Sequence, residues 1–106
     1  MAVDFTTHKG ININRTSYQG RIWVSFHTIC SVFGYPLLPE DDKTDAEWYI
    51  EFSDGMVGTI YNYKNGKNYL GHGGTPTVEI EVWNVGGHSP EVFRRISDLL
   101  LGFSSR

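Results

Sequence analysis

Apolar and polar residues alternate in five stretches of the chain, and this period of two predicts five β-strands. The first two stretches, 10–15 and 20–25, are separated by a turn-prone segment and are predicted to form a β-hairpin. The third stretch, 46–52, leads into the fourth, 57–63, through an Asp-Gly turn. The fifth stretch, 78–83, places its valines and isoleucine on one face and its glutamates and tryptophan on the other.

Two other segments repeat apolar residues at helical spacing. The first helix is predicted to follow Ser25, which suits an N-cap, and to end at Gly34. The second is predicted to open with Ser89 as N-cap and Pro90 in the first turn, with Gly102 as a C-terminal cap. The apolar faces of these helices consist of Phe26, Ile29, Cys30 and Phe33 in the first and of Val92, Ile96, Leu99, Leu100 and Phe103 in the second.

This order of two strands, a helix, three strands and a helix predicts an α+β fold in which two helices pack on one face of an antiparallel sheet of about five strands. At 106 residues, the chain fits a single domain spanning residues 1–106. The acidic segment 37–45 is predicted to be a solvated loop. The glycine-rich segment 70–76 is predicted to be an extended excursion and a candidate mobile loop.

The sheet face opposite the helices is predicted to carry exposed aromatic rings among amide and guanidinium groups. Trp83 is expected on this face and therefore partly exposed, provided that the strand register holds. Such a mixture is typical of recognition surfaces, because rings offer stacking area at a low entropic cost. A homodimer interface, or pairing of the rings across strands, fits the same pattern. The predicted outer-face residues are Asn12, Asn14, Arg21, Trp23, Tyr49 and Trp83.

Basic residues next to these aromatics are candidates for holding phosphate. Arg15 and Arg21 flank the first predicted turn, where they would grip a phosphate or keep an edge strand soluble. Arg95 borders the apolar face of the last helix and would either lean over a pocket or pair with Glu91 four residues earlier. Lys64 stands next to tyrosines, a combination that suits nucleotide binding as well as an ordinary solvated hairpin end.

Composition narrows the function further. The net charge of −3 and the isoelectric point near 5.7 argue against DNA and anionic membranes as partners. No apolar run is long enough to span a bilayer and the N-terminus does not resemble a signal peptide, so we expect a cytoplasmic protein. Neither the single Cys30 nor the four scattered histidines predict a metal site or cofactor. Because no nucleophile, base and orienting group occur in a known motif, an enzyme is the weakest interpretation.

Four motifs resemble a known family of small bacteriophage proteins. They are NRTSYQGRI, VFGYP, DAEWYIEFSDGMVGTIYNYK and WNVGGHSPEV, and together they span most of the chain. The chain is similar in these motifs to the Thoeris anti-defence sponge family. It departs from the family pattern at Asn84 and Val85 in the WxxGG motif, and at Gly58, where alanine is usual.

The resemblance implies a homo-oligomer, a dimer or larger, that sequesters a cyclic ADP-ribose isomer without cleaving it and so suppresses TIR-based bacterial defence. Cyclic oligonucleotides are further ligands that it implies. The ligand would lie between two protomers, in contact with aromatic, arginine and polar side chains. The residues within or beside the shared motifs that would take these roles are Arg15, Tyr61, Asn62, Lys64, Trp83 and Arg95. A different hypothesis is an anti-CRISPR-like protein inhibitor that presents the acidic loop 40–47 to a basic partner.

Overall fold

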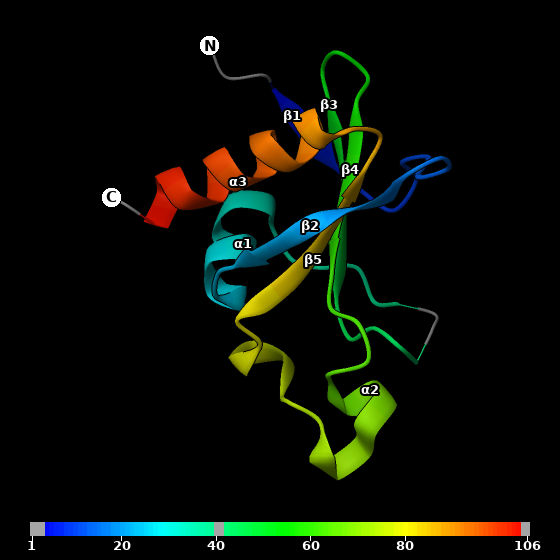
Figure 1. Ribbon diagram of the computed structural model, residues 1–106, viewed down its shortest axis with the longest axis vertical. Coiled ribbons are helices and arrows are strands. Elements are labelled where there is room, and N and C mark those ends of the chain that lie inside the picture. The colour runs from blue at the N-terminus through cyan, green and yellow to red at the C-terminus, as the bar shows by residue number, and fades with distance from the viewer. Residues whose placement is uncertain (1–3, 40–41, 105–106) are drawn as a thin grey trace.

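A five-stranded antiparallel sheet with strand order β1-β3-β4-β5-β2 is the framework of the molecule. The computed structural model describes residues 4–39 and 42–104. Helices α1 and α3 lie on one side of the sheet, and α2 lies beyond one end of it (Figure 1). The elements in chain order are β1 (Phe5–Thr7), β2 (Ser17–Trp23), α1 (Phe26–Phe33), β3 (Glu47–Phe52), β4 (Val57–Tyr61), α2 (Lys67–Leu70), the 3-10 turns η1 (Gly71–Gly73) and η2 (Thr77–Glu79), β5 (Val82–Gly87) and α3 (Pro90–Ser104).

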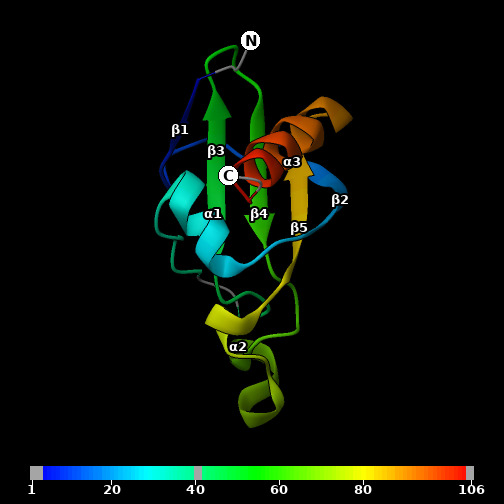
Figure 2. The same cartoon turned by 90° about the vertical axis from the view of Figure 1, so that its left-hand side faces the viewer.

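This architecture confirms the predicted fold class, since the sheet is antiparallel and two helices cover a single face. Figure 2 shows α1 and α3 in front of the strands. Strands β3 and β4 follow the prediction most closely: Trp48, Ile50 and Phe52 are all buried, and Gly55 makes the intervening turn with a φ of 92°. No helix among the described residues covers the opposite face of the sheet, which is called the open face below.

Aromatic rings form the centre of the core between the helices and the sheet. The indoles of Trp48 and Trp83 meet edge to face with 5.3 Å between ring centroids, and Phe26 of α1 stacks on Trp83 at 6.1 Å. The Trp83 Nε1 donates a hydrogen bond to the Ile80 carbonyl at 3.2 Å. Each large apolar side chain buried in this way contributes about 1.5–3 kcal/mol, so the two tryptophans anchor the helix layer to the sheet.

Helix α1 begins and ends as its sequence predicts. The Ser25 Oγ accepts a hydrogen bond from the Thr28 amide at 3.1 Å, and Gly34 closes the helix with a φ of 87°. Ile29 and Phe33 of its apolar stripe are buried, while Phe26 and Cys30 pack against the core from its margin. Burial raises the pKa of the Cys30 thiol, so the cysteine serves packing.

Helix α3 approaches the sheet closely because glycines leave room for it. Val92, Ile96 and Leu100 on its inner face are fully buried. A Cβ on Gly87 would come within 2.8 Å of the Val92 side chain, and a Cβ on Gly58 would overlap the same side chain. The glycines therefore set the distance between α3 and strands β4 and β5.

The predicted hairpin between 10–15 and 20–25 is wrong. The N-terminal strand β1 lies earlier in the chain and pairs with β3, whereas β2 pairs with β5. Segment 8–16 instead crosses the open face from one edge of the sheet to the other, and Ile11 within it is buried. The alternating Ile11 and Ile13 belong to this crossing and not to a strand. Arg15, near the end of the crossing, has a left-handed backbone with a φ of 67°.

The predicted register of the last strand is also wrong. Strand β5 starts at Val82, and Thr77–Glu79 form a 3-10 turn. Because a shift by one residue exchanges the two faces of a strand, Trp83 points into the core with no exposed surface. Gly86 and Gly87 belong to the strand and not to a turn.

Smaller predictions had mixed outcomes. Helix α3 starts at Pro90 as predicted, but the buried Ser89 hydroxyl has no hydrogen-bond partner and does not cap it, and Gly102 lies inside the helix. The excursion before β5 is present, yet it contains α2 and two 3-10 turns. Of the acidic loop, Glu40 and Asp41 lie outside the described residues. Among the described residues, no helix is long and apolar enough to cross a membrane.

Candidate functional site

Strand register brings three tyrosines, Tyr18, Tyr49 and Tyr61, to the open face. One row across the sheet runs Tyr49, Thr59, Gly86 and Tyr18, and the next runs Glu47, Tyr61, Asn84 and Arg21. Tyr63 follows β4 beyond the end of these rows. Large rings therefore gather on the one face that no helix covers.

These rings line a groove of about 320 Å³, which we call the tyrosine groove. Its size is at the lower end of small-molecule sites, which span about 300–1,000 Å³. Two segments form its walls, the end of the 8–16 crossing on one side and the chain before β3 on the other. The lining residues are Ile13, Thr16, Ser17, Tyr18, Lys43, Thr44, Glu47, Tyr49, Thr59, Tyr61, Tyr63 and Gly86.

The first wall is fixed by short-range hydrogen bonds. Thr16 donates to the Ile13 carbonyl through both its amide, at 3.2 Å, and its Oγ1, at 2.7 Å. The His88 Nε2 lies 3.3 Å from the Asn14 carbonyl oxygen, which links the crossing to the turn before α3. This wall is therefore attached to the body of the molecule at more than one point.

The second wall depends on Asn62, whose side chain is 1% exposed. Its Oδ1 accepts hydrogen bonds from the amides of Asp45 at 2.7 Å and Ala46 at 3.2 Å. Its Nδ2 donates to the Asp45 carboxylate and to the Asn65 Oδ1, both at 2.9 Å. Asn62 thus uses its whole hydrogen-bonding capacity on the segments around the groove.

At Gly86 the groove floor consists of backbone without a side chain. A Cβ there would lie 2.6 Å from the Thr59 Oγ1 and 3.7 Å from the Tyr61 ring. Any side chain at this position would have to displace Thr59, so the glycine keeps the centre of the floor open for a flat ligand. This glycine of the WNVGG motif therefore forms part of the groove floor, within strand β5 and not in a turn.

The chemistry of the groove is that of neutral phenols with a few charges. Burial, together with the neighbouring Tyr18 and Tyr63, raises the pKa of Tyr61, so its hydroxyl stays protonated at neutral pH and can donate a hydrogen bond. The Tyr49 hydroxyl donates to the Glu47 Oε1 at 3.1 Å. Rings of this kind stack on planar groups, and their hydroxyls orient polar ones.

Two basic residues next to the groove adopt a left-handed backbone conformation that is uncommon for side chains with a Cβ. They are Arg15, with a φ of 67°, and Lys64, with a φ of 59°. The Lys64 Nζ lies 5.2 Å from the centroid of the Tyr63 ring and 5.4 Å from that of Tyr69. Residues in such conformations concentrate at functional sites. Here Arg15 belongs to the 8–16 crossing, and the Lys64 amide donates a hydrogen bond to the Lys43 carbonyl of the second wall at 2.7 Å.

The seven sequence-predicted site residues are therefore not all brought together. Tyr61 lies in the groove, Arg15 and Lys64 belong to segments beside it, and Arg21 is exposed at the β2 end of the Tyr61 row. Trp83 and Asn62 offer no ligand-accessible surface, because one is in the core and the other is sealed in its hydrogen-bond network.

Arg95 has a structural use. Its guanidinium makes hydrogen bonds to Asp54 and to Glu91, and lies over the Phe52 ring at 5.1 Å. The predicted pairing with Glu91 is thus present. The Asp54 contact lies at the β3-β4 turn, away from the tyrosine groove.

Sequence reasoning missed several members of the groove. Tyr18 lies in the predicted turn between the first two stretches, Gly86 is expected in a turn before the last helix, and Thr59 is not among the predicted site residues. All three nevertheless line the groove. The signal for Thr59 was present, because it alternates with buried residues of β4 in phase with Tyr61. Tyr18 had no such signal, since a bulge between Tyr18 and Gly20 breaks the period of β2.

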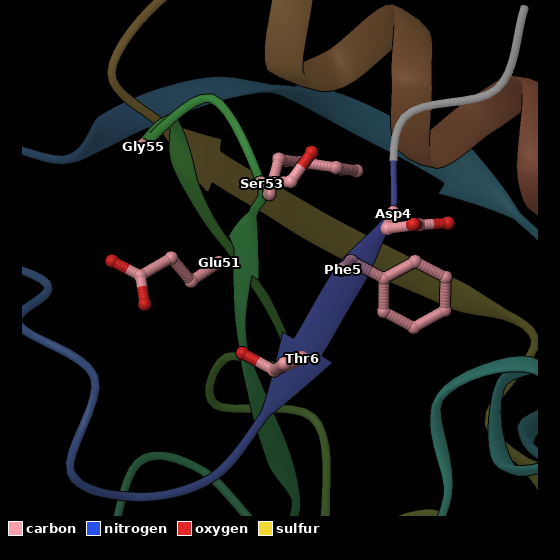
Figure 3. A pocket seen from close by; sticks show the side chains of 7 residues that line it. Asp4, Phe5, Thr6, Glu51, Ser53 and Gly55 are labelled. Carbon is pink, nitrogen blue, oxygen red and sulfur yellow. The ribbon is translucent and has the colours of Figure 1, made fainter.

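The surface carries other hollows besides the tyrosine groove. One of about 360 Å³ lies beside the edge strand β1 and is lined by Asp4, Phe5, Thr6, Glu51, Phe52, Ser53 and Gly55. Figure 3 shows that the Phe5 ring and the Glu51 carboxylate extend to opposite sides of the strands. Because its lining groups diverge, this hollow is a notch at the sheet edge.

Comparisons with known proteins do not indicate a function, so the proposal below rests on the site itself. No protein-family model matches the chain, and a search of curated proteins finds no significant similarity. Among the described residues, no group of three or more histidine, cysteine, aspartate or glutamate side chains is arranged to hold a metal ion.

Proposed function

We propose that the protein binds a small nucleotide in the tyrosine groove and releases it unchanged. The observation that carries this proposal is the convergence of Tyr18, Tyr49, Tyr61 and Tyr63 on a single hollow of about 320 Å³. Aromatic side chains stack on bases regardless of base identity, with a contribution of about 1–3 kcal/mol per base. Phenol hydroxyls and the Lys43 ammonium at the margin supply polar contacts for ribose and phosphate.

The resemblance to the Thoeris anti-defence sponges is consistent with this site. Thr59 and Tyr61 belong to the motif DAEWYIEFSDGMVGTIYNYK, Tyr18 belongs to NRTSYQGRI, and Gly86 belongs to WNVGGHSPEV. All four residues line the groove, so three motifs that are distant in sequence meet there. In the proposed role, a phage-encoded protein captures a cyclic ADP-ribose isomer and keeps it from the effector of a TIR-based defence system.

The proposed ligand contacts differ from those that the resemblance implies. Stacking falls to Tyr61 and its tyrosine neighbours in place of Trp83. The basic contacts fall to Lys43 in the groove and to Arg15 and Lys64 beside it, in place of Arg95. A homo-oligomer remains part of the proposal, because a second copy over the open face would close a groove that a single chain leaves open. Solution mass with and without nucleotide tests this part.

The experiment for the function itself separates binding from catalysis. The protein is mixed with cyclic ADP-ribose or one of its isomers, unbound nucleotide is removed, the protein is denatured, and the supernatant is analysed by chromatography. The proposal requires recovery of the intact nucleotide at a fixed ratio to protein. Absence of bound nucleotide rejects the proposed binding, and recovery of an opened or hydrolysed product rejects the non-catalytic role.

The alternative of a protein-binding inhibitor loses one of the acidic side chains that it would present to a basic partner. In the acidic loop, Asp45 is engaged internally, because its carboxylate accepts hydrogen bonds from the Asn62 Nδ2 at 2.9 Å and the Asn68 amide at 3.1 Å. Asp45 is therefore not available to mimic a nucleic acid. The feature that favours a protein partner is instead an exposed tryptophan at the end of β2.

A further inference from the structure

Trp23 is 71% exposed, whereas Trp48 is 1% exposed and Trp83 is fully buried. An exposed indole of this size leaves a large apolar area in water, and tryptophan is the residue most enriched at the energetic centres of protein interfaces. Among residues 4–39 and 42–104, no ring stacks on Trp23 and no basic group lies over it. Its faces are available to another molecule.

The indole borders a hollow of about 250 Å³, which we call the Trp23 hollow. Val82 lies opposite Trp23 in the strand register, and the buried Ile80 closes the hollow from within. The lining residues are Trp23, Asn65, Thr75, Glu79, Ile80, Glu81 and Val82. None of them lines the tyrosine groove, so the two hollows are separate sites.

Glu79 and Glu81 line this hollow together with Trp23. Both side chains are exposed, and within the described chain neither makes an ion pair, since the arginines that do so contact Glu91 and Asp54. Backbone hydrogen bonds fix their positions: the Glu79 amide donates to the Pro76 carbonyl at 2.9 Å, and the Val24 amide donates to the Glu81 carbonyl at 2.9 Å. The hollow therefore combines an exposed indole with negative charge that no ion pair within the described chain compensates.

We propose that the Trp23 hollow binds an arginine side chain of a protein partner. A guanidinium group is planar, stacks on indole faces and forms forked hydrogen bonds with carboxylates. These are the properties that Trp23 and the two glutamates complement. A lysine ammonium would meet the charges but would stack less well, and a neutral side chain would leave the carboxylates without a counter-charge. The net charge of −3 favours the approach of a basic partner.

The test uses short blocked peptides as probes for the unidentified partner. Acetyl-Gly-Arg-Gly-amide is titrated into the protein while the three tryptophan indole N–H signals are followed by NMR. The matched peptides carry citrulline, an uncharged analogue of arginine with similar shape, or lysine. We expect a saturable shift of the Trp23 signal alone, with the citrulline peptide at least about tenfold weaker because it lacks the charge for both the cation–π and carboxylate contacts.

Variants distinguish this site from a general attraction between charges. Trp23→Ala should abolish the arginine response at Glu79 and Glu81 backbone amides, and Glu79→Gln with Glu81→Gln should weaken binding while leaving the indole in place. Unchanged signals from the buried Trp48 and Trp83 indoles report that each variant is folded. Equal responses to arginine and citrulline, a lysine peptide that binds as tightly as arginine, or an arginine response that persists in Trp23→Ala would overturn the proposal.

This test is independent of nucleotide binding. A protein that binds arginine at Trp23 but no nucleotide loses the proposed function and keeps the partner surface. A protein that binds nucleotide but shows no arginine response keeps the proposed function and loses the partner surface.

Discussion

The guanidinium of Arg95 holds the carboxylate of Asp54 through two parallel hydrogen bonds, from Nη1 to Oδ1 at 3.0 Å and from Nη2 to Oδ2 at 2.7 Å. The Arg95 side chain is only 17% exposed and also donates from Nε to the Glu91 Oε2 at 3.1 Å. Because Asp54 lies in the β3-β4 turn and Arg95 in α3, this contact attaches helix α3 to the end of the sheet where β3 and β4 are joined.

The Asp54 pair predicts a pH dependence of stability at low pH. The hydrogen bond from Arg95 is the main cause that lowers the pKa of Asp54 to about 2, whereas an unfolded aspartate titrates near about 3.9. The unfolded state therefore takes up the proton first as the pH falls. The stabilisation is complete above about pH 4 and disappears as the pH falls through the folded pKa.

Urea unfolding of the wild type and of Asp54→Asn between pH 2 and pH 6 measures this effect. The difference in unfolding free energy between the two proteins should be largest above about pH 4 and shrink toward pH 2. Asp98→Asn, which alters an exposed carboxylate on helix α3, is the control for the loss of one negative charge. A difference for Asp54→Asn that stays constant over the whole range would contradict the assignment.

Asn62 is predicted to matter for stability and not for ligand contact. Asn62→Ala removes the acceptor of the Asp45 and Ala46 amides and leaves buried polar groups without partners. Each such group costs about 1–3 kcal/mol, so the loss should be clear in thermal or urea unfolding. Asn68→Ala, at an exposed position, provides a milder control. An Asn62→Ala protein as stable as the wild type would show that the network is not needed.

Gly58 is predicted to be required for the close approach of α3. The methyl group of Gly58→Ala would overlap the Val92 side chain and lie 2.9 Å from the Ile96 Cδ1. Forcing an extra carbon into a packed core costs about 1–3 kcal/mol. Gly102→Ala is the matched control, because a Cβ there meets nothing within 4 Å and alanine favours the helix. Its stability should equal or exceed that of the wild type, and a Gly58→Ala variant that behaves in the same way would contradict the packing argument.

Local patterns were sufficient to predict the fold class and several elements. Strand β3 is predictable because every second residue from Trp48 to Phe52 faces the core, and α1 is predictable because Ser25 and Gly34 cap it. Both depend on neighbours in sequence. The pairing of β1 with β3 depends on where a distant segment docks, and the alternation of Ile11 and Ile13 carries no information about that partner.

The candidate site was harder to predict because it depends on strand register. Trp83 and Tyr49 are both predicted to lie on the open face, but the register of β5 places Trp83 in the core, so only Tyr49 lies there. The sequence predicts Gly86 in a turn. Its close approach to Thr59 becomes evident only when β4 and β5 lie side by side. The aromatic character of the open face was predictable, whereas the particular rings were not.

The most direct measurement is the affinity of the wild type, Tyr61→Ala and Tyr35→Ala for cyclic ADP-ribose and its isomers by titration calorimetry. Tyr61 lines the tyrosine groove, whereas Tyr35 is 92% exposed near the end of α1 and outside the groove. Loss of one stacked ring should weaken binding by about tenfold or more in Tyr61→Ala, and Tyr35→Ala should bind as the wild type does. A wild type that binds none of these nucleotides, or equal affinities for Tyr61→Ala and the wild type, would contradict nucleotide capture in the tyrosine groove.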